Sequence, residues 1–292
     1  MNAGEQTTPP QPTLDALLPD AMATKAELVG VTKAHLPLRR LVPLGVLAGA
    51  FIALGGNFAT VVTSGSGLDS GVSKLLGGVV FALGLILVVI SGAELFTGNT
   101  LIVMAYASRR VTAKALLRNW LVVYVSNFAG AAATAALVVM SGRLSAGDGS
   151  VGVRALQVAE AKGTVSVTEA IFSGVLANCL VCLAVWMTLS ARTIVDKVVV
   201  IVPPIAAFVA AGFEHSVANM YFFPVALWQK AFAPDRFWAA SGKTTGDFGH
   251  VSTQRLLVGN LLPVTLGNII GGAVLVGLVY WFVYLRHRPP AS

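Results

Sequence analysis

Charged residues are scarce in this sequence. They make up 11% of its 292 residues, whereas an average globular chain carries about 25%. Apolar residues make up 55%, so the chain lacks the polar surface that a soluble protein presents to water on all sides. The same apolar excess excludes a disordered chain. The composition therefore indicates a membrane protein.

Histidine and cysteine are also scarce, with four and two copies. Cys179 and Cys182 have a CxxC spacing, but they stand in an apolar stretch without a charged or histidine neighbour. That setting favours two small buried side chains over redox or metal chemistry. Because no metal-ligand set, nucleophile or cofactor motif is visible, we predict no bound metal, no cofactor and no enzymatic activity. A membrane enzyme is the alternative, which metal-dependent activity would support.

Long apolar runs are abundant. Most reach the roughly 20 residues that a helix needs to cross the hydrocarbon of a bilayer. They lie at 41–62, 75–93, 119–142, 170–191, 198–213 and 256–285. The second and fifth runs continue, after a brief polar interruption, through 95–108 and 216–229. No series of ten-residue segments alternates as β-barrel strands do. We predict an all-α membrane protein with six transmembrane helices, of which spans two and five are interrupted.

Basic residues gather on one side of the predicted membrane. Twelve of the twenty flank the spans in short segments that share one side if the spans alternate, and they are Lys25, Lys33, Arg39, Arg40, Arg109, Arg110, Lys114, Arg118, Arg192, Lys197, Arg286 and Arg288. Since Lys and Arg concentrate on the cytoplasmic side, both termini are predicted to be cytoplasmic. The net charge of +7 therefore reports topology, and we expect no nucleic-acid partner.

Three segments are expected along the chain: an N-terminal cytoplasmic tail with an amphipathic helix (1–40), a single transmembrane channel domain (41–288) and a short C-terminal tail (289–292). The amphipathic helix is expected within 13–36. Its apolar face would consist of Leu14, Leu17, Leu18, Met22, Leu28 and Val31.

An internal repeat organises the chain. The frame G-x-E-x-x-x-x-N occurs at 92–99 and again at 212–219, and each copy interrupts a span. The string GVLA occurs at 45–48 and 174–177, and Asn119, Asn127 and Gly130 recur with the same spacing as Asn260, Asn268 and Gly271. Each half has three spans, an odd number, so the second half must cross the membrane in the opposite orientation. Inverted repeats with interrupted helices are typical of transporters and channels, whose substrate sites lie near the midplane.

The two interruptions contain the ionisable residues deepest in the apolar spans, Glu94, Glu214 and His215. Backbone groups freed by a helix break must find partners inside the protein. We expect each glutamate to accept hydrogen bonds from N–H groups of its own break, with Asn99 and Asn219 assisting; direct contact with a substrate is the alternative. The glycines expected to relax the backbone at the breaks are Gly92, Gly98 and Gly212.

His215 has no counterpart in the repeat, where Leu95 stands. We predict a pore-facing imidazole that donates a hydrogen bond or a proton to a passing solute, since histidine titrates near neutral pH. A satisfied core histidine is the alternative. Thr97 is the neutral polar candidate opposite it, with a local backbone cap as the alternative. Positive helix ends at the breaks favour a small anion over a cation. Apolar candidates for a constriction that gates by dewetting, or for ordinary core packing, are Phe81, Leu85, Leu95, Phe96 and Phe208.

Four segments together resemble the formate/nitrite transporter family, and its formate channel branch most of all. They are SGAELFTGNT (91–100), AGFEHSVANM (211–220), the Asn119-Trp120 pair and LLPVTLGNIIGGAVLVGLVYWFVYLR (261–286). The resemblance implies a homopentamer of aquaporin-like protomers, each with its own pore. It implies that His215 is the central pore residue, with Glu214 and Asn219 in its motif and Thr97 facing it from a mobile loop.

The resemblance also implies a vestibule lysine, Lys162, and a gating role for the helix at 13–36. Two constrictions are implied, with Phe81, Leu85, Leu95 and Phe96 on one side and Phe208 near the other. The implied function is transport of a small monovalent anion, formate or nitrite, by a channel or a proton-coupled transporter in a prokaryotic cytoplasmic (inner) membrane. The alternatives are an aquaporin-like channel for a neutral solute and a family branch selective for hydrosulfide, nitrite, lactate or acetate.

Overall fold

The computed structural model describes residues 15–65 and 67–287. The predicted tail at 289–292 and Leu14, predicted on the apolar face of the N-terminal helix, lie outside the described residues. Every regular element in the described part is helical. The α-helices are α1 Pro19–Ala34, α2 Leu38–Thr63, α3 Ser70–Ser91, α4 Phe96–Asn99, α5 Val103–Ala107, α6 Ala113–Met140, α7 Ser150–Gly163, α8 Val167–Ser190, α9 Ile194–Ala210, α10 Ser216–Phe232, α11 Asp235–Ser241, α12 Leu262–Ile269 and α13 Val279–Tyr284. Short helical segments join them: η1 Thr100–Ile102, η2 Arg143–Ser145, η3 Thr245–Phe248, η4 Arg255–Leu261 and η5 Ile270–Leu278.

The predicted six spans are confirmed. Five stretches of helix are long and apolar enough to cross a membrane: α2, α3, α6, α8 and 257–284. The remaining span consists of α9 and α10, each 17 residues long, on either side of a break at 211–215. Span two is broken in the same way at 92–95, between α3 and α4. The chain is a multi-pass membrane protein.

Side-chain caps define where several spans begin. The carboxylate of Asp69 accepts a hydrogen bond from Gly71 N at the start of α3. Capping boxes open α8, with Ser166 and Glu169, and α9, with Thr193 and Asp196. Such caps satisfy the N–H groups that the first turn of a helix leaves without partners. The polar residues between the apolar runs therefore act as start signals.

Close helix crossings hold each half together. A Cβ atom added to Gly130 of α6 would overlap the carbonyl oxygen of Val46 on α2. The equivalent glycine of the second half, Gly271 in η5, meets the carbonyl oxygen of Val175 on α8 in the same way. Small residues let membrane helices approach closely where the lipid supplies no hydrophobic driving force. The repeated glycine thus marks the same crossing in both halves.

The helix α1 differs from the expectation for 13–36. It begins at Pro19, and its buried residues are mostly small (Met22, Ala23, Ala26, Glu27, Gly30 and Ala34). Leu18 and Leu28, expected on the apolar face, are 71% and 48% exposed. Small side chains occupy the buried face because α1 packs against α5 and α13 at close range. A Cβ atom added to Gly30 would lie 3.2 Å from the Cβ of Ala105.

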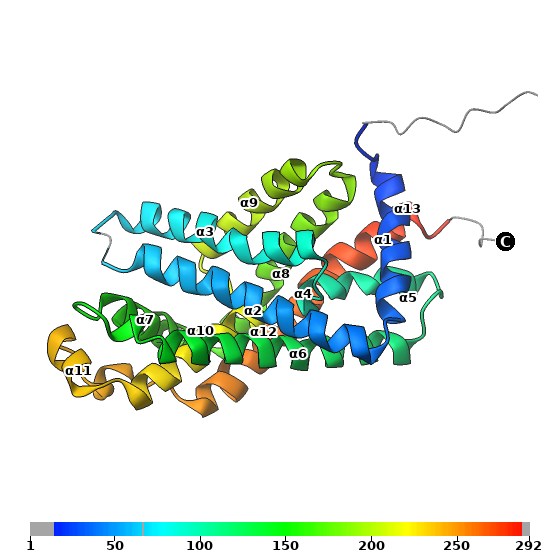
Figure 1. Cartoon of the computed structure of the whole chain (residues 1–292). Helices are drawn as coiled ribbons and strands as arrows, with labels where there is room; N and C mark the ends of the chain where they lie inside the picture. The colour runs from blue at the N-terminus through cyan, green and yellow to red at the C-terminus, as the bar shows by residue number, and fades with distance from the viewer. Residues whose placement is uncertain (1–14, 66, 288–292) are drawn as a thin grey trace, which may run out of the picture.

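Figure 1 shows α1 across one end of the molecule, beside α5 and α13, while α7 and α11 lie at the opposite end. The boundary predicted between residues 40 and 41 falls inside α2, which begins at Leu38. Because α1 lies beside α13, the two chain ends of the described part lie on the same side of the bundle.

Candidate functional site

The first break is held by one buried asparagine. Gly92 ends α3 with a left-handed φ of 73°, which glycine adopts without steric cost. At the start of α4, Phe96 N donates to Asn127 Oδ1 at 2.9 Å. Asn127 Nδ2 donates in turn to the carbonyl oxygens of Gly45 and Glu94 at 2.7 and 2.9 Å. The amide of α6 therefore satisfies both ends of the interrupted backbone.

The second break repeats this arrangement atom for atom. Gly212 has a φ of 74°, and Ser216 N donates to Asn268 Oδ1 at 2.9 Å. Asn268 Nδ2 donates to the carbonyl oxygens of Gly174 and Glu214 at 2.8 and 3.1 Å. The sequence marked these asparagines as repeat positions but did not assign them this role. Gly98, by contrast, lies inside α4 without a left-handed φ, so the expectation that it relaxes the backbone is wrong.

The two glutamate side chains bind side chains rather than backbone N–H groups. Glu94 accepts hydrogen bonds from Lys33 Nζ and from Asn99 Nδ2, both at 2.7 Å. Glu214 accepts them from Lys162 Nζ at 2.9 Å and from Asn219 Nδ2 at 2.6 Å. The expectation that the glutamate side chains accept from N–H groups of their own breaks is therefore wrong, whereas the expected assistance of Asn99 and Asn219 is present. A buried carboxylate is stabilised only by a cation and further hydrogen bonds, and these pairs supply both.

Lys33 is the residue of this network that the sequence reasoning missed. Its signal is a spacing: Lys33 precedes the first GVLA string by twelve residues, and Lys162 precedes the second by twelve. The backbone carbonyls of both lysines also accept from the repeat asparagines, Lys33 O from Asn119 at 2.9 Å and Lys162 O from Asn260 at 3.3 Å. The repeat therefore includes α1 and α7 as well as the six spans.

The two breaks meet at His215 and Thr97. The Nε2 atom of His215 lies 3.0 Å from Thr97 Oγ1, and both side chains are buried. The other ring nitrogen, Nδ1, accepts a hydrogen bond from Ala218 N at 3.0 Å. Because Nδ1 is an acceptor, the proton of the neutral ring is on Nε2, which donates toward Thr97. A second proton could reach Nδ1 only if this helix cap opened.

A polar cluster supports the backbone of Thr97. Its carbonyl oxygen accepts from Thr100 Oγ1 at 2.6 Å, and from Asn178 Nδ2 and Cys182 Sγ at 3.3 Å each. Gly272 of η5 covers the cluster, since a Cβ there would overlap Thr100 Oγ1. Among the described residues, no group of three or more histidine, cysteine, aspartate or glutamate side chains could hold a metal ion.

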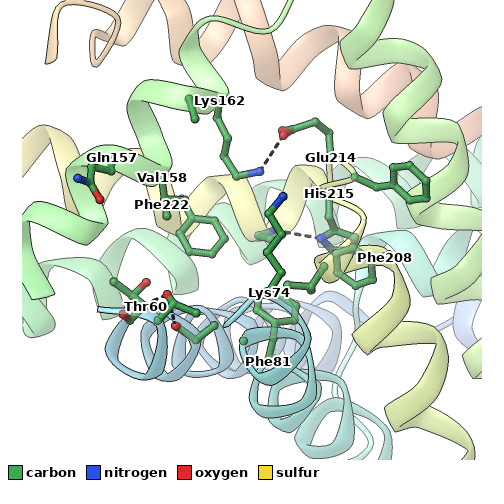
Figure 2. A pocket seen from close by; sticks show the side chains of 18 of the residues that line it. Thr60, Lys74, Phe81, Gln157, Val158, Lys162, Phe208, Glu214, His215 and Phe222 are labelled. Atoms are coloured by element: carbon green, nitrogen blue, oxygen red, sulfur yellow. Dashed lines mark hydrogen bonds and ion pairs between the residues drawn. The ribbon is translucent and has the colours of Figure 1, made fainter. Parts of the chain in front are cut away.

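Two cavities lie on either side of the His215–Thr97 contact. The first, of about 390 Å³, lies between α2, α3, α7, α9 and α10 and reaches His215. Figure 2 shows Lys162 and Glu214 paired at its wall, with the ring of Phe208 beside His215. The second, of about 310 Å³, lies between α1, α3, α8 and α9 and reaches Glu94.

The constriction residues group differently from the expectation. Phe81 lies against Phe208, with ring centroids 5.7 Å apart, and both line the first cavity. Leu85 and Leu95 line the second cavity. Phe96 lines neither and packs its ring edge-on against Trp120 and Tyr124. The expected grouping of Phe81 and Phe96 with the leucines is wrong because Phe81 lies one helical turn before Leu85, toward the opposite side of the break, and Phe96 points into α6.

Each cavity is lined by three cations and one glutamate. The first has Lys74, Arg154 and Lys162 with Glu214, and the second has Lys25, Lys33 and Lys197 with Glu94. Burial, together with the neighbouring charges of Arg192 and Lys197, lowers the pKa of Lys25. Clefts lined by one sign of charge raise the local concentration of the opposite ion. Since cations outnumber carboxylates in each lining, both cavities favour anions over cations.

Paired helix breaks, inverted halves and two cation-lined cavities that meet at a buried hydrogen bond define a membrane transport protein of the inverted-repeat class. A family model described as "Formate/nitrite transporter" matches residues 20–282. The chain therefore belongs to the formate/nitrite transporter family, and it is a transporter rather than an enzyme.

Named relatives agree with this assignment. The chain is 46% identical over 275 residues to "Formate channel FocA" of Escherichia coli (strain K12), covering 94% of this chain and 96% of that protein. It is 37% identical to "Formate channel FocB" of the same organism, covering 91% and 96%. A solved structure described as "Pentameric formate channel with formate bound" matches with a TM-score of 0.81 and 44% identity, covering 85% of this chain and 98% of that one.

Proposed function

We propose that the chain carries a small monovalent anion of the formate class across the membrane, through a pore in each protomer. The observation that carries the proposal is the buried contact of His215 Nε2 with Thr97 Oγ1, placed between two cavities that are each lined by three cations. The names of the relatives, which refer to formate channels, support formate as the first anion to test.

In the proposed mechanism, the cations of either cavity draw the anion in, and the apolar side chains around the breaks remove its water. Burial raises the pKa of a carboxylate, so the dehydrated anion becomes easier to protonate. It then crosses the constrictions formed by Phe81 with Phe208 and by Leu85 with Leu95, either as the anion or as the neutral acid formed with a proton taken from the solvent at the cavity mouth. Thr97 and His215 offer it hydrogen bonds between these constrictions.

The other polar residues have supporting roles in this proposal. Lys162 is a vestibule cation on α7; Glu214 holds its ammonium group, and Asn219 holds Glu214. Asn219 Oδ1 has no hydrogen-bond partner among the described residues, whereas the equivalent atom of Asn99 accepts from Lys33 Nζ at 3.1 Å. The Lys162 ammonium group therefore has a second acceptor in its network, Asn219 Oδ1, to which it can donate when an anion passes.

The proposal includes assembly and location. We place the chain in a prokaryotic inner membrane with both termini in the cytoplasm, which the clustering of basic residues at the α1 end supports. A homopentamer is supported by the likeness to the solved pentameric channel. The molar mass of the detergent-solubilised protein, measured by light scattering, tests the pentamer.

The function is tested by flux into proteoliposomes across a pH gradient, comparing formate, nitrite, acetate, lactate and hydrosulfide. We expect formate or nitrite to give the fastest flux. Swelling driven by a neutral solute such as glycerol, without any anion flux, would contradict the proposal.

The role of His215 is tested with two variants in the same assay. His215→Asn keeps the helix cap, because Oδ1 of asparagine can take the place of Nδ1, but its amide is too short to reach Thr97 Oγ1, so we expect lower flux that keeps its pH dependence. His215→Ala removes both hydrogen bonds of the ring, the one to Thr97 and the one from Ala218 N. We expect flux to fall at least about tenfold, because loss of buried hydrogen bonds between neutral groups costs on that scale. Loss of pH dependence in His215→Asn, with flux retained, would show instead that a proton passes through the imidazole.

A further inference from the structure

Arg154 presents a free guanidinium edge to the first cavity. It stands on α7, and its Nε donates to Thr63 Oγ1 at 3.1 Å. Thr63 Oγ1 itself donates to the Ala59 carbonyl oxygen at 2.8 Å, so its lone pair is turned toward Arg154. Neither Nη atom of Arg154 has a hydrogen-bond partner among the described residues. The hydrogen bond of Nε therefore fixes the guanidinium plane, and the two Nη atoms remain available to a ligand.

The charge of Arg154 is not neutralised by the protein. The cavity has one carboxylate, Glu214, and that group is already engaged by Lys162, Asn219 and Asn260. Within the described part of the chain, neither Arg154 nor Lys74 forms an ion pair. Arg154 is half-buried, and burial lowers the pKa of its guanidinium. A partly buried cation without a counter-charge is costly, and an anion in the cavity offsets that cost.

The internal repeat supplies a comparison within the same molecule. Arg154 precedes Lys162 by eight residues, and Lys25 precedes Lys33 by eight. At the position equivalent to Arg154, the second cavity therefore has an ammonium group, whose Nζ donates to the Leu189 carbonyl oxygen at 2.8 Å. No arginine lines that cavity among the described residues. An ammonium attracts any anion as a point charge, whereas a guanidinium fork matches two oxygens held in a plane.

We propose that Arg154, assisted by Lys74, forms an entry subsite in the first cavity for planar monoanions with two oxygen atoms, a carboxylate such as formate or nitrite. The subsite discriminates by shape, and its counterpart at Lys25 discriminates by charge alone. This inference rests on the proposed anion transport and assigns the substrate class at one mouth of the pore.

The test is a charge-preserving exchange, Arg154→Lys, in intact cells that lack other formate channels, where the α7 side faces the medium in the proposed orientation. The half-saturating concentration for uptake of labelled formate and of hydrosulfide is measured for each variant. We expect Arg154→Lys to raise the value for formate about fivefold, equivalent to about 1 kcal/mol, and to leave that for hydrosulfide within about twofold. Arg143→Lys, an exposed residue outside both cavities, is the matched control.

Two results would overturn the subsite: equal changes for formate and hydrosulfide, or no change for either. If Arg154→Lys does not yield folded protein, Thr63→Val carries the test, because it removes the anchor of the fork and leaves the charge. We expect the same direction there, by about twofold to threefold, and an unchanged formate value would again overturn the subsite. A wild-type protein that takes up no formate would instead refute the proposed function, which keeps the two failures distinct.

Discussion

At the scale of single residues, the two breaks differ in what lies beneath them. The repeat aligns Gly174 with Gly45 and Glu214 with Glu94, so Thr97 corresponds to Val217, and the cluster residues Thr100, Asn178 and Cys182 correspond to Met220, Gly49 and Ala53. The polar cluster therefore occurs only under Thr97. Symmetry does not require it, and it lies beneath the hydroxyl that contacts His215.

Asn178 is the residue of this cluster whose side chain has the most hydrogen-bond acceptors. Its Nδ2 also donates to the Asn268 carbonyl oxygen at 2.6 Å. We expect Asn178→Ala to lower stability by about 2 kcal/mol, because it leaves buried acceptors without a donor, and to reduce formate flux by shifting Thr97. Thermal unfolding and proteoliposome flux measure the two effects. Cys179→Ala is the control, since its thiol donates only weakly to Gly271 O and does not touch Thr97. Equal effects of the two variants would contradict the positioning role.

At the scale of elements, α1 and α7 are equivalent parts of the pore wall rather than appendages. Each lies at one end of the molecule (Figure 1), and each supplies a lysine side chain to the glutamate of one break. The ion pair of Lys33 with Glu94 leaves the carboxylate side chain only 5% exposed. The helix α1 therefore supplies the counter-charge of the buried carboxylate in the first break.

This pairing predicts different costs for two replacements of a basic residue. Lys33→Met leaves a buried carboxylate without its cation, so we expect a loss of about 3 kcal/mol of unfolding free energy. Arg110→Met removes the partner of Glu27 in a pair whose arginine side chain is 39% exposed, and we expect less than about 1 kcal/mol. Thermal unfolding in detergent compares them. A smaller loss for Lys33→Met than for Arg110→Met would show that Glu94 does not depend on α1.

The crossing of α2 with α6 gives a second prediction for the elements. We expect Gly130→Ala to prevent accumulation of folded protein, because its Cβ would overlap a backbone oxygen that cannot move without separating the helices. Gly259→Ala is the control, since its Cβ would lie 3.6 Å from the Arg255 side chain. The yield of monodisperse protein after size exclusion is the measurement. Normal yield of Gly130→Ala would mean that the crossing tolerates a wider separation.

At the scale of the whole molecule, opposite orientation of the halves requires both chain ends on one side of the membrane. Alkaline phosphatase, which is active only outside the cytoplasm, reports this when fused to truncated chains. We expect activity from a fusion after Gly147, between η2 and α7, and none from a fusion after Arg192, between α8 and α9. The reverse pattern would place the termini outside and would contradict the orientation derived from the basic residues.

Sequence periodicity predicted most of the fold, because an internal repeat specifies breaks, asparagines and glycines together. Contacts between residues far apart in the sequence could not be predicted from the repeat. Lys33 and Glu94 are 61 residues apart, and their contact depends on α1 lying over the end of the bundle. The side of the break that Phe81 faces depends on the rotation of α3, which no local pattern specifies. The sequence could therefore suggest residues that meet at the breaks, such as Thr97 and His215, but not the two separate cavities beside them.

The charged network of each break has a consequence for how the chain is synthesised. Lys33, Glu94, Asn99 and Asn119 all belong to the first half, and Lys162, Glu214, Asn219 and Asn260 all belong to the second. The first half can therefore leave the ribosome and enter the bilayer with its buried carboxylate already neutralised, before the second half exists. The contact of Thr97 with His215, the cluster behind Thr97 and the packing of Phe81 against Phe208 are among those that form only when the second half is present. We therefore expect two co-expressed half-chains, divided within 143–149, each to carry the partners of its own buried carboxylate into the bilayer.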